Sequence, residues 1–429
     1  MHLRSPRRLR AAAVAAVALM LALSGCTASD EPDFSYTPPE QVDGALPDDM
    51  TAQLQAAVEH AMVASGATGA IVGVWVPWSG QWVAGLGTQS AEDDTEVTAD
   101  MSFRVADVTR LMTCDVLYGM ADDGRIKLDA PVPKYVSGVA DLSDITLLDL
   151  CNGTSGLGSS EAAVKPYWLN TPERVWAPLQ EASFGLGVQR GPAHTAYRDS
   201  DAGYLMLGLA LERASGLSAS QLIKKYVTGP LELKSTSLPG ATAAEPKPTP
   251  ALKGAYLPAT DTGYDCTAPV DITTSSASIG FTDGGVTSTI TDLGRYLQAE
   301  ARQALRDKNA KPARFENPLP VSANAPAWYQ ATGGALLVGS MIGQQGWVPG
   351  YSTAAYSDPA TGFTVAVTLN NSSSGSSVAA YLSWQVAAIA SKAPAAKGQT
   401  APDFGLPFTA EQYGQTITDI AICKAPAAE

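Results

Sequence analysis

The chain has 429 residues, enough for one large domain or two smaller ones, and its 45% hydrophobic and 16% charged residues are typical of a globular protein. Acidic residues outnumber basic ones by 42 to 28, and because four of the basic residues lie within the first 25, the rest of the chain carries a net charge of −18. Such an acidic chain is not expected to bind nucleic acid, because phosphate binding requires a basic surface.

The N-terminus has the pattern of a targeting segment. Four arginines between residues 4 and 10 precede the apolar run Ala11–Leu23, which is too short to span a bilayer as a permanent helix. The run leads into Leu-Ser-Gly-Cys, which resembles the bacterial lipoprotein signal. We therefore expect residues 1–25 to be a signal peptide and Cys26 to be lipidated, so that the lipid anchors the protein to the outer face of the cell membrane. An ordinary signal peptide with a chance cysteine is the alternative.

The next segments predict a tether, a helix, two strands and a second helix. Residues 26–49 are acidic and contain prolines, which favours a flexible tether. Apolar residues at helical spacing predict a helix over residues 50–65. The stretch "AIVGVWVPWSGQWVAGLG" predicts two strands joined by a tight turn, with its tryptophans in packing positions. The stretch "DVTRLMTCDVLYGMADDG" predicts a helix that ends at Gly124.

The rest of the chain predicts helices followed by strands. Helices and loops dominate to about residue 300, and Thr289 with Asp292 forms a capping-box-like helix start. "GGALLVGSM", "YSTAAYS" and "FTVAVTLN" then predict strands, and a helix is expected near residues 378–389. Strands from both ends of the chain predict one α+β domain over residues 50–392, with an inserted, mostly helical lobe. Residues 393–429 form an Ala/Pro-rich C-terminal extension.

Several of these stretches carry a family resemblance. "MADDGRIKLDAPVPKYV", "LLDLCNGTSGL", "GYLMLGLALERASGLS" and "GGVTSTITDLGRYLQA" resemble, in order, segments of the serine β-lactamase-related proteins. This family includes class C β-lactamases, D-alanyl-D-alanine carboxypeptidases and esterases. The resemblance, from Met50 to Ser391, implies a β-lactamase/transpeptidase-like fold with an antiparallel sheet. It also implies a catalytic site made of Ser-x-x-Lys, Tyr-x-Asn and His-x-Gly.

The chain departs from the family at these catalytic motifs. It has "FRVADVTR" where the family has "FRIGSVTK", so that an aspartate replaces the serine and an arginine replaces the lysine. It has "DSDAGY" for "YSNTGY" and "GQQG" for "GHTG". The altered motifs therefore place these residues at the former catalytic positions: Asp107, Arg110, Asp199, Asp201, Gln344 and Gly346.

The substituted residues are poorly suited to acyl transfer. Arg110 cannot act as a general base, because its pKa stays above about 12. Attack by Asp107 would give a high-energy mixed anhydride, and its spacing from Arg110 favours an ion pair. Loss of a hydrolase nucleophile or base alone costs on the order of 10⁶ in kcat. We therefore expect a pseudoenzyme without a cofactor. The alternative is an active serine hydrolase of the β-lactamase, carboxypeptidase or esterase type with an unrecognised nucleophile.

Three other interpretations of these residues are open. Ser200 and His194 lie close enough in sequence to Asp199 to suggest a relocated triad, although a loop serine that bonds to nearby backbone is the simpler interpretation. His60 is the other histidine after the signal, at a surface position of the first helix, and Ser155 is expected to be structural. Carboxylates of Asp107, Asp199 and Asp201, with the Gln344 amide, could instead form an oxygen cage for a divalent cation. An ion-paired pocket around Arg110 is the favoured interpretation, with no metal.

Four cysteines remain after Cys26. They allow three pairings, and two disulfides are the default in an oxidising compartment, with free thiols as the alternative. No cysteine spacing suggests zinc. Because the family resemblance implies that the elements carrying Cys114 and Cys151 pack together, we expect a Cys114–Cys151 bridge, and then a Cys266–Cys423 bridge. The acidic cleft favours a cationic or protein ligand, such as a cell-wall peptide or a partner protein.

Overall fold

The computed structural model describes residues 36–139, 142–306 and 310–424. The predicted signal peptide, the predicted lipidation site Cys26 and the first part of the predicted tether lie outside the described residues. Within the described ranges, no helix is both long and apolar enough to cross a membrane.

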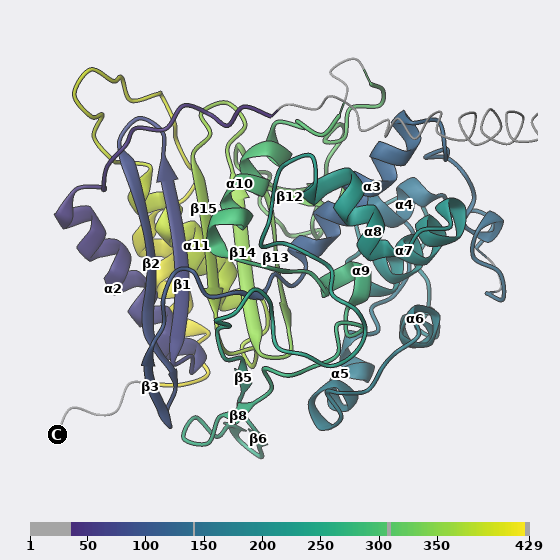
Figure 1. The fold of residues 1–429 in the computed structure, drawn as a ribbon, viewed down its shortest axis with the longest axis horizontal. Coiled ribbons are helices and arrows are strands. Elements are labelled where there is room, and N and C mark those ends of the chain that lie inside the picture. The colour runs from purple at the N-terminus through teal and green to yellow at the C-terminus, as the bar shows by residue number, and fades with distance from the viewer. Residues whose placement is uncertain (1–35, 140–141, 307–309, 425–429) are drawn as a thin grey trace, which may run out of the picture. The chain divides into compact units, whose positions relative to one another are not determined.

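A nine-stranded antiparallel sheet forms the centre of the fold (Figure 1). Its order is β10-β11-β12-β13-β14-β15-β1-β2-β3, so that β1 from the N-terminal part pairs with β15 from the C-terminal part, with Val72 opposite Val367. The predicted sheet of N- and C-terminal segments is therefore confirmed. Its strands are β1 (Gly69–Val76), β2 (Gly80–Ser90), β3 (Asp93–Glu96), β10 (Leu319–Pro320), β11 (Tyr329–Thr332), β12 (Ala335–Val338), β13 (Met341–Val348), β14 (Tyr351–Ser357) and β15 (Thr364–Leu369).

Helices cover both faces of this sheet. On one face, α11 (Ser377–Ala390) packs on β14 and β15, flanked by α2 (Asp48–Ser65) and α12 (Ala410–Asp419). On the other face lie α10 (Ile290–Ala301) and α3 (Val108–Asp122). Because helices cover both faces, every residue of β1 and β15 is buried, and these strands form apolar runs.

A mostly helical lobe lies beyond α3, as expected from the sequence (Figure 1). It contains α4 (Leu147–Asn152), α5 (Glu161–Asn170), α6 (Pro178–Leu186), α7 (Asp201–Ser215), α8 (Ala219–Ile223) and α9 (Phe281–Gly284). Short strand pairs accompany it: β4 (Phe103–Arg104) with β9 (Thr287–Ser288), β5 (Ala255–Tyr256) with β8 (Val270–Asp271), and β6 (Ala259–Thr260) with β7 (Gly263–Tyr264). Helix α3 contacts both β13 and α7, so it lies where the sheet and the lobe meet.

The chain joins the folded body earlier than predicted. Leu46 is 2% exposed and belongs to the core against the sheet. Gln41 donates from Nε2 to the carbonyls of Val76 and Gly80, both at 3.1 Å. The flexible tether predicted through residue 49 was therefore wrong for its last part, because one apolar side chain and one amide fasten it to the β1–β2 hairpin.

The C-terminal extension packs on the domain through α12. Phe408, Tyr413 and Ile417 are buried against α11 as part of the core. A disulfide between Cys266 and Cys423 holds the end of the extension, with 5.9 Å between the two Cα atoms. The second disulfide, Cys114–Cys151, joins α3 to α4. Both predicted pairings are confirmed.

A buried ion network holds the middle of α3. The guanidinium of Arg314, 1% exposed, pairs with Asp115 of α3 and, at 2.8 Å, with Glu300 of α10. Tyr296 donates its hydroxyl to Asp115 at 2.7 Å. Because these charges are paired and fully enclosed, the network serves packing and offers no charge to solvent.

Candidate functional site

A strained turn presents the first residue of α3. Ala106 has φ +51° and is fully buried. This left-handed backbone costs an alanine about 1–2 kcal/mol, so that surrounding packing must hold it. Asp107 follows as the N-cap of α3, yet its side chain does not cap the helix. The carboxylate is free to turn toward Arg110 instead.

Arg110 lies among three carboxylates. Its Nη2 is 3.1 Å from Asp107, its Nη1 is 2.6 Å from Asp199, and its Nε is 2.7 Å from Asp283. The guanidinium also lies 4.9 Å above the ring of Tyr204. The predicted pair between Asp107 and Arg110 is confirmed. The role of Asp283 was missed, because it comes from α9 and no local spacing links it to α3.

The cluster is buried on one side and open on the other. The side chains of Arg110, Asp107 and Asp283 are 5%, 14% and 10% exposed, whereas that of Asp199 is 63% exposed. A ligand could therefore reach the cluster only from the side of Asp199. We call the set Asp107, Arg110, Asp199 and Asp283 the Arg110 cluster.

The excess of carboxylates shifts the protonation of the cluster. Burial raises the pKa of Asp107 well above its ordinary value; Arg110 opposes this, while Asp283 and Asp199 add to it. Burial likewise raises the pKa of Asp283 to about 7, against the effect of Arg110. Burial alone would lower the pKa of Arg110, but the three surrounding carboxylates raise it, and the net result is a pKa above the ordinary arginine value. Arg110 therefore stays protonated and cannot take a proton from a nucleophile.

Two other predicted positions lie nearby but bond elsewhere. Asp201 is 5% exposed, and its Oδ1 accepts from the backbone N–H of Ser160 at 2.7 Å. Gln344 donates from Nε2 to the carbonyl of Gly334 at 2.9 Å. Gly346, in contrast, lies against the cluster, because a Cβ there would come 2.1 Å from Cγ of Asp107. Only glycine at 346 lets β13 approach the Asp107 carboxylate so closely.

The alternative cation cage is not formed. The guanidinium of Arg110 bridges Asp107 and Asp199, and Asp201 turns away to the backbone of Ser160. Across the described parts of the chain, no group of three His, Cys, Asp or Glu side chains is arranged to hold a metal ion. The cluster is therefore an ion-paired pocket.

The relocated triad is not formed either. Ser200 donates its hydroxyl to the carbonyl of Gly158 at 2.8 Å and accepts from the N–H of Gly203, so it caps α7. His194 places Nδ1 2.7 Å from Asp149, on another element, and this hydrogen bond raises the histidine pKa. Serine and histidine thus each serve local structure.

The remaining two candidates also have local contacts. His60 on α2 lies 3.1 Å from the hydroxyl of Thr418 on α12. Ser155 is buried and accepts from the N–H of Leu157 at 3.3 Å. Neither of these hydrogen bonds involves a residue of the Arg110 cluster. The contacts agree with the expected surface histidine and structural serine.

Helices α5 and α6 add groups that the sequence did not reveal. Glu181 of α6 is fully buried; its Oε1 accepts from Gly280 at 3.3 Å, and burial raises its pKa to about 8. Glu161 of α5 lies near enough to Asp107 for its charge to add to the raised pKa of that carboxyl. These interactions link α5 to the start of α3 and α6 to the start of α9, so no sequence spacing predicts them.

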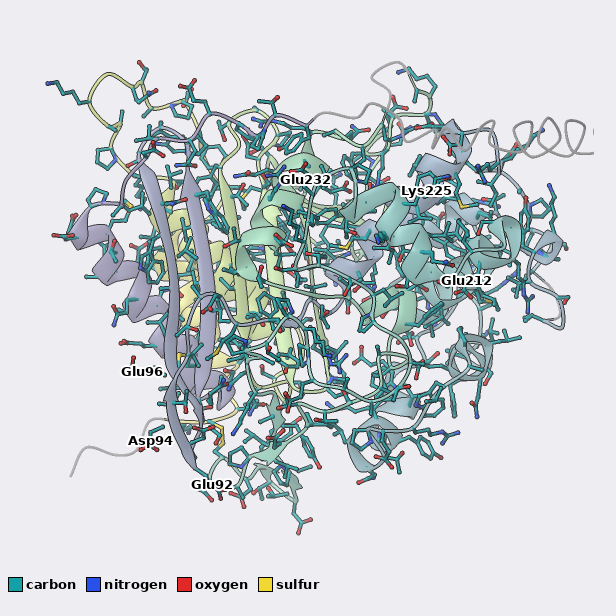
Figure 2. All side chains as sticks on the ribbon, viewed as in Figure 1. Glu92, Asp94, Glu96, Glu212, Lys225 and Glu232 are labelled. Atoms are coloured by element: carbon teal, nitrogen blue, oxygen red, sulfur yellow. A yellow bond between two sulfur atoms is a disulfide. The ribbon has the colours of Figure 1, made fainter. Side chains whose placement is uncertain are left out.

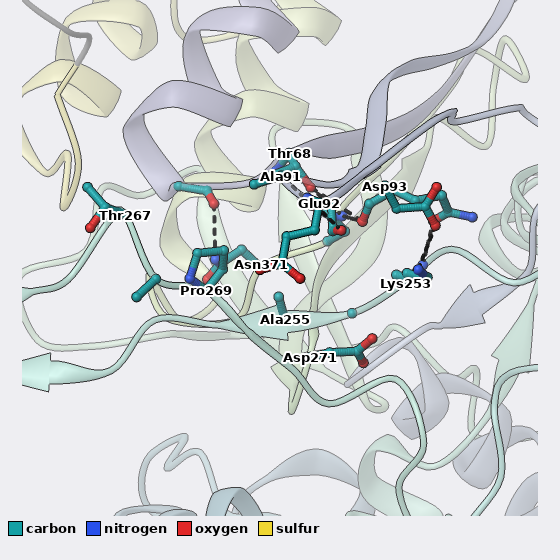
Figure 3. A pocket seen from close by; sticks show the side chains of 16 residues that line it. Thr68, Ala91, Glu92, Asp93, Lys253, Ala255, Thr267, Pro269, Asp271 and Asn371 are labelled. Carbon is teal, nitrogen blue, oxygen red and sulfur yellow. Dashed lines mark hydrogen bonds and ion pairs between the residues drawn. The ribbon is translucent and has the colours of Figure 1, made fainter.

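A separate polar cavity of about 340 Å³ lies between the β2–β3 hairpin and β5 (Figure 3). Lys253 and Asp93 pair across its wall at 2.5 Å, and the exposed acids Glu92 and Asp94 project from the same hairpin (Figure 2). The amide of Asn371, which also lines it, donates to the carbonyl of Gly66. This amide therefore holds a backbone turn. The cavity is lined by no residue of the Arg110 cluster, so it is separate from the candidate site.

The fold is β-lactamase/transpeptidase-like. It combines a large antiparallel sheet with a helical lobe, and α3 begins where the two meet. The profile of the Beta-lactamase family matches residues 54–388, well over half of the chain. The chain belongs to this family.

Comparison with individual proteins agrees with this assignment. The chain is similar to the D-alanyl-D-alanine-carboxypeptidase/endopeptidase AmpH of Escherichia coli, with 29% identity over 249 residues, which are 56% of this chain and 59% of the relative. The chain thus spans less than two thirds of the length of this relative.

Among solved structures, a D-stereospecific amidohydrolase from Streptomyces superposes with a TM-score of 0.65 and 24% identity, covering 76% of this chain and 95% of the other. A penicillin-binding protein homologue from Pyrococcus abyssi gives a TM-score of 0.61 and 19% identity, covering 79% and 76%. At these identities the structures support the fold alone.

Proposed function

We propose that this protein is a pseudoenzyme of the Beta-lactamase family, whose former catalytic cleft binds a ligand without forming an acyl-enzyme. The single observation that carries the proposal is the Arg110 cluster. At the positions of nucleophile, base and tyrosine, the chain has one guanidinium ion-paired to Asp107 and Asp199 at 3.1 and 2.6 Å.

Each step of serine hydrolysis lacks its group here. Acyl transfer requires a nucleophile beside a base that can accept its proton. Asp107 would have to attack as a carboxylate that is already paired with Arg110, and its product would be a mixed anhydride. The nearby hydroxyl of Ser200 is bonded to backbone as a helix cap. The hydrolytic chemistry for which these relatives are named is therefore not proposed for this chain.

We further propose that the protein acts at the cell surface as a lipoprotein, held to the membrane by lipid on Cys26. The signal pattern supports the anchor, and two disulfides support an oxidising compartment. A cell-wall peptide or a partner protein is the ligand class that such a location favours.

Intact mass measurement tests the loss of catalysis. The chain from residue 27 onward is incubated with a penicillin and, separately, with a fluorophosphonate, with an active serine enzyme of the family treated in parallel. We expect adducts on the active enzyme and none on this chain, while circular dichroism and a cooperative melting transition show that it is folded. A stoichiometric adduct would sink the proposal, and peptide mapping would identify the nucleophile of an active hydrolase.

A further inference from the structure

The helical lobe contains a groove of about 480 Å³ between α8 and the loop that follows, residues 229–237. Ile223 and Leu233 form its floor, because they line the groove while being only 2% and 4% exposed. Most of the other lining residues carry hydroxyl or ammonium groups: Ser220, Lys224, Thr228, Lys234, Thr236 and Ser237. An apolar floor with a few polar groups around it is the usual composition of a small-molecule site.

The groove is separate from the Arg110 cluster. The chain between α8 and the loop forms a π-helical turn, Lys224–Thr228, a rare geometry that is frequent at functional sites. Behind this turn the ring of Tyr226 packs on Gly119 of α3, where a Cβ would come 2.6 Å from the ring. At about 1.5 Å per residue, Gly119 lies about 18 Å along the helix axis from Asp107. No residue of the Arg110 cluster lines the groove.

Hydrogen bonds hold the loop wall of the groove in place. Asp292, in the first turn of α10, accepts from the N–H of Ser235 at 2.7 Å and from the hydroxyl of Thr236 at 3.0 Å. Ser237 exchanges backbone hydrogen bonds of 3.0 and 2.9 Å with Thr287 of β9. Because these bonds fix the wall in advance, a ligand does not have to order it on binding.

Two unpaired lysines line the groove, one from each wall. Lys224 directly follows α8, and Lys234 comes from the loop. Both are exposed, and in the described parts of the chain no carboxylate lies within ion-pair distance of either ammonium group. Glu232 is the one carboxylate among the lining residues, so the lining has two positive charges against one negative. Because the chain after residue 25 carries −18, a positive groove is a local exception that attracts anions.

The neighbouring Lys225 has a different environment. Its ammonium group lies 4.0 Å from Asp123 and 4.9 Å from the centre of the Tyr226 ring. It does not line the groove, whereas Glu232 does (both are labelled in Figure 2). Adjacent lysines therefore differ in their partners, and Lys225 provides a matched control for Lys224.

We propose that this groove binds an amphiphilic anion, which has a carboxylate or phosphate at one end of a short apolar chain. Lys224 and Lys234 receive the anionic group through charge-assisted hydrogen bonds, and the apolar chain lies on the floor of the groove. Ser220, one helical turn before Lys224 and so on the same helix face, supplies a further hydroxyl donor. This site goes beyond the proposed function of the cleft and does not depend on it.

Four probes with the same hexyl chain length separate charge from hydrophobic contact. Hexanoate, hexyl phosphate, hexanol and hexylamine are titrated into the purified chain at low and at high salt, and binding is followed by isothermal titration calorimetry. We expect saturable binding of an anion that weakens with salt, roughly tenfold weaker binding of hexanol, and no binding of hexylamine. The tighter of the two anions identifies the head group. Equal affinity for hexanol, preference for hexylamine, or no saturable binding of either anion up to about 10 mM overturns the proposal.

Variants of opposite sign test the position of the site. Lys224→Met and Lys234→Met should each weaken anion binding roughly tenfold, because each removes one charged donor while keeping an apolar stem. Glu232→Gln should tighten binding several-fold, because a repelling carboxylate is lost. Lys225→Met removes the same charge from the adjacent position and should leave the affinity unchanged. Equal losses for Lys224→Met and Lys225→Met would mean that only overall charge matters, and the assignment of the site would be wrong.

Lysine acetylation tests the same site without any substitution. A limiting amount of an acetylating reagent is added to the chain with and without saturating anion, and peptide mass spectrometry follows the rate at each lysine. The anion should slow acetylation of Lys224 and Lys234 several-fold and leave Lys225 unchanged. Unchanged rates at Lys224 and Lys234 would place any bound anion elsewhere and overturn the proposal. The penicillin experiment, in contrast, bears only on the Arg110 cluster, so the two proposals fail independently.

Discussion

Replacing Arg110 with methionine should destabilise the protein strongly, and more so at high pH. The substitution keeps an unbranched side chain but leaves Asp107 and Asp283, 14% and 10% exposed, without their cation. Removing one partner of a buried ion pair costs about 3–5 kcal/mol of unfolding free energy. Asp199 is mostly exposed, so its lost pair adds less than about 1 kcal/mol. We therefore expect a loss of about 3–5 kcal/mol at pH 8.

The pH dependence follows from the raised carboxyl pKa values. A carboxyl whose folded pKa is raised holds its proton in the folded state, so stability falls as pH rises from its unfolded to its folded pKa. For Asp283 this window runs from the ordinary aspartate pKa of 3.8 to about 7. Without Arg110, the pKa of Asp283 rises further and the window extends upward. At pH 5 both buried carboxyls remain protonated, and the loss should shrink to about 1–2 kcal/mol, from lost packing and hydrogen bonds.

Urea unfolding at pH 5 and pH 8 measures both values. Lys311→Met serves as the matched control, because it removes a cation from an exposed pair, with Nζ 3.8 Å from Glu316 and side chains 78% and 48% exposed. It should cost less than about 1 kcal/mol at either pH. A loss below about 1 kcal/mol for Arg110→Met at pH 8, or equal losses at the two pH values, would refute the electrostatic account of the cluster.

Three further predictions concern the nucleophile position, a disulfide and a buried acid. Asp107→Ser alone should still form no fluorophosphonate adduct by intact mass, because Arg110 cannot accept the serine proton; an adduct would show that another base is present. Replacing Cys266 and Cys423 with serine should lower the free energy of unfolding by about 2–4 kcal/mol and expose the C-terminal extension to limited proteolysis, and unchanged protease resistance would contradict this role. Glu181→Gln should flatten the loss of stability between about pH 5 and pH 8 in melting experiments, since burial raises the Glu181 pKa from 4.5 to about 8 and in that range only the folded state holds the proton; an unchanged slope would contradict the assignment.

The sheet could be predicted because its signals are local and strong. Apolar stretches marked β1, β12, β14 and β15, and the turn after β1 marked its hairpin with β2, whereas β13, with its two glutamines, was not predicted as a strand. Strand β3, with the sequence Asp-Asp-Thr-Glu, carries no such signal and forms only because it extends β2 at the edge. The tether was overestimated for a similar reason, since a single residue, Leu46, decides where the chain joins the core.

The site could be predicted only where its contacts are short in sequence. Asp107 and Arg110 stand one helical turn apart, so their pairing follows from helix geometry. Asp283 reaches Arg110 across 173 residues, and its stretch "FTDGG" has no feature that requires a carboxylate at the centre. Glu181 meets Gly280 only through the packing of α6 against the start of α9, across 99 residues, which no periodicity reports.

The backbone around Asp107 is closely constrained. Ala106 has a strained left-handed conformation, and Gly346 lets β13 lie against the carboxylate of Asp107. The Arg314 network shows how this protein builds a purely structural ion cluster, with the guanidinium 1% exposed and its partners enclosed. The Arg110 cluster differs because Asp199, 63% exposed, opens it to solvent. A strained turn, a close glycine contact and an exposed carboxylate distinguish this cluster from a purely structural one and support the proposed role in ligand binding.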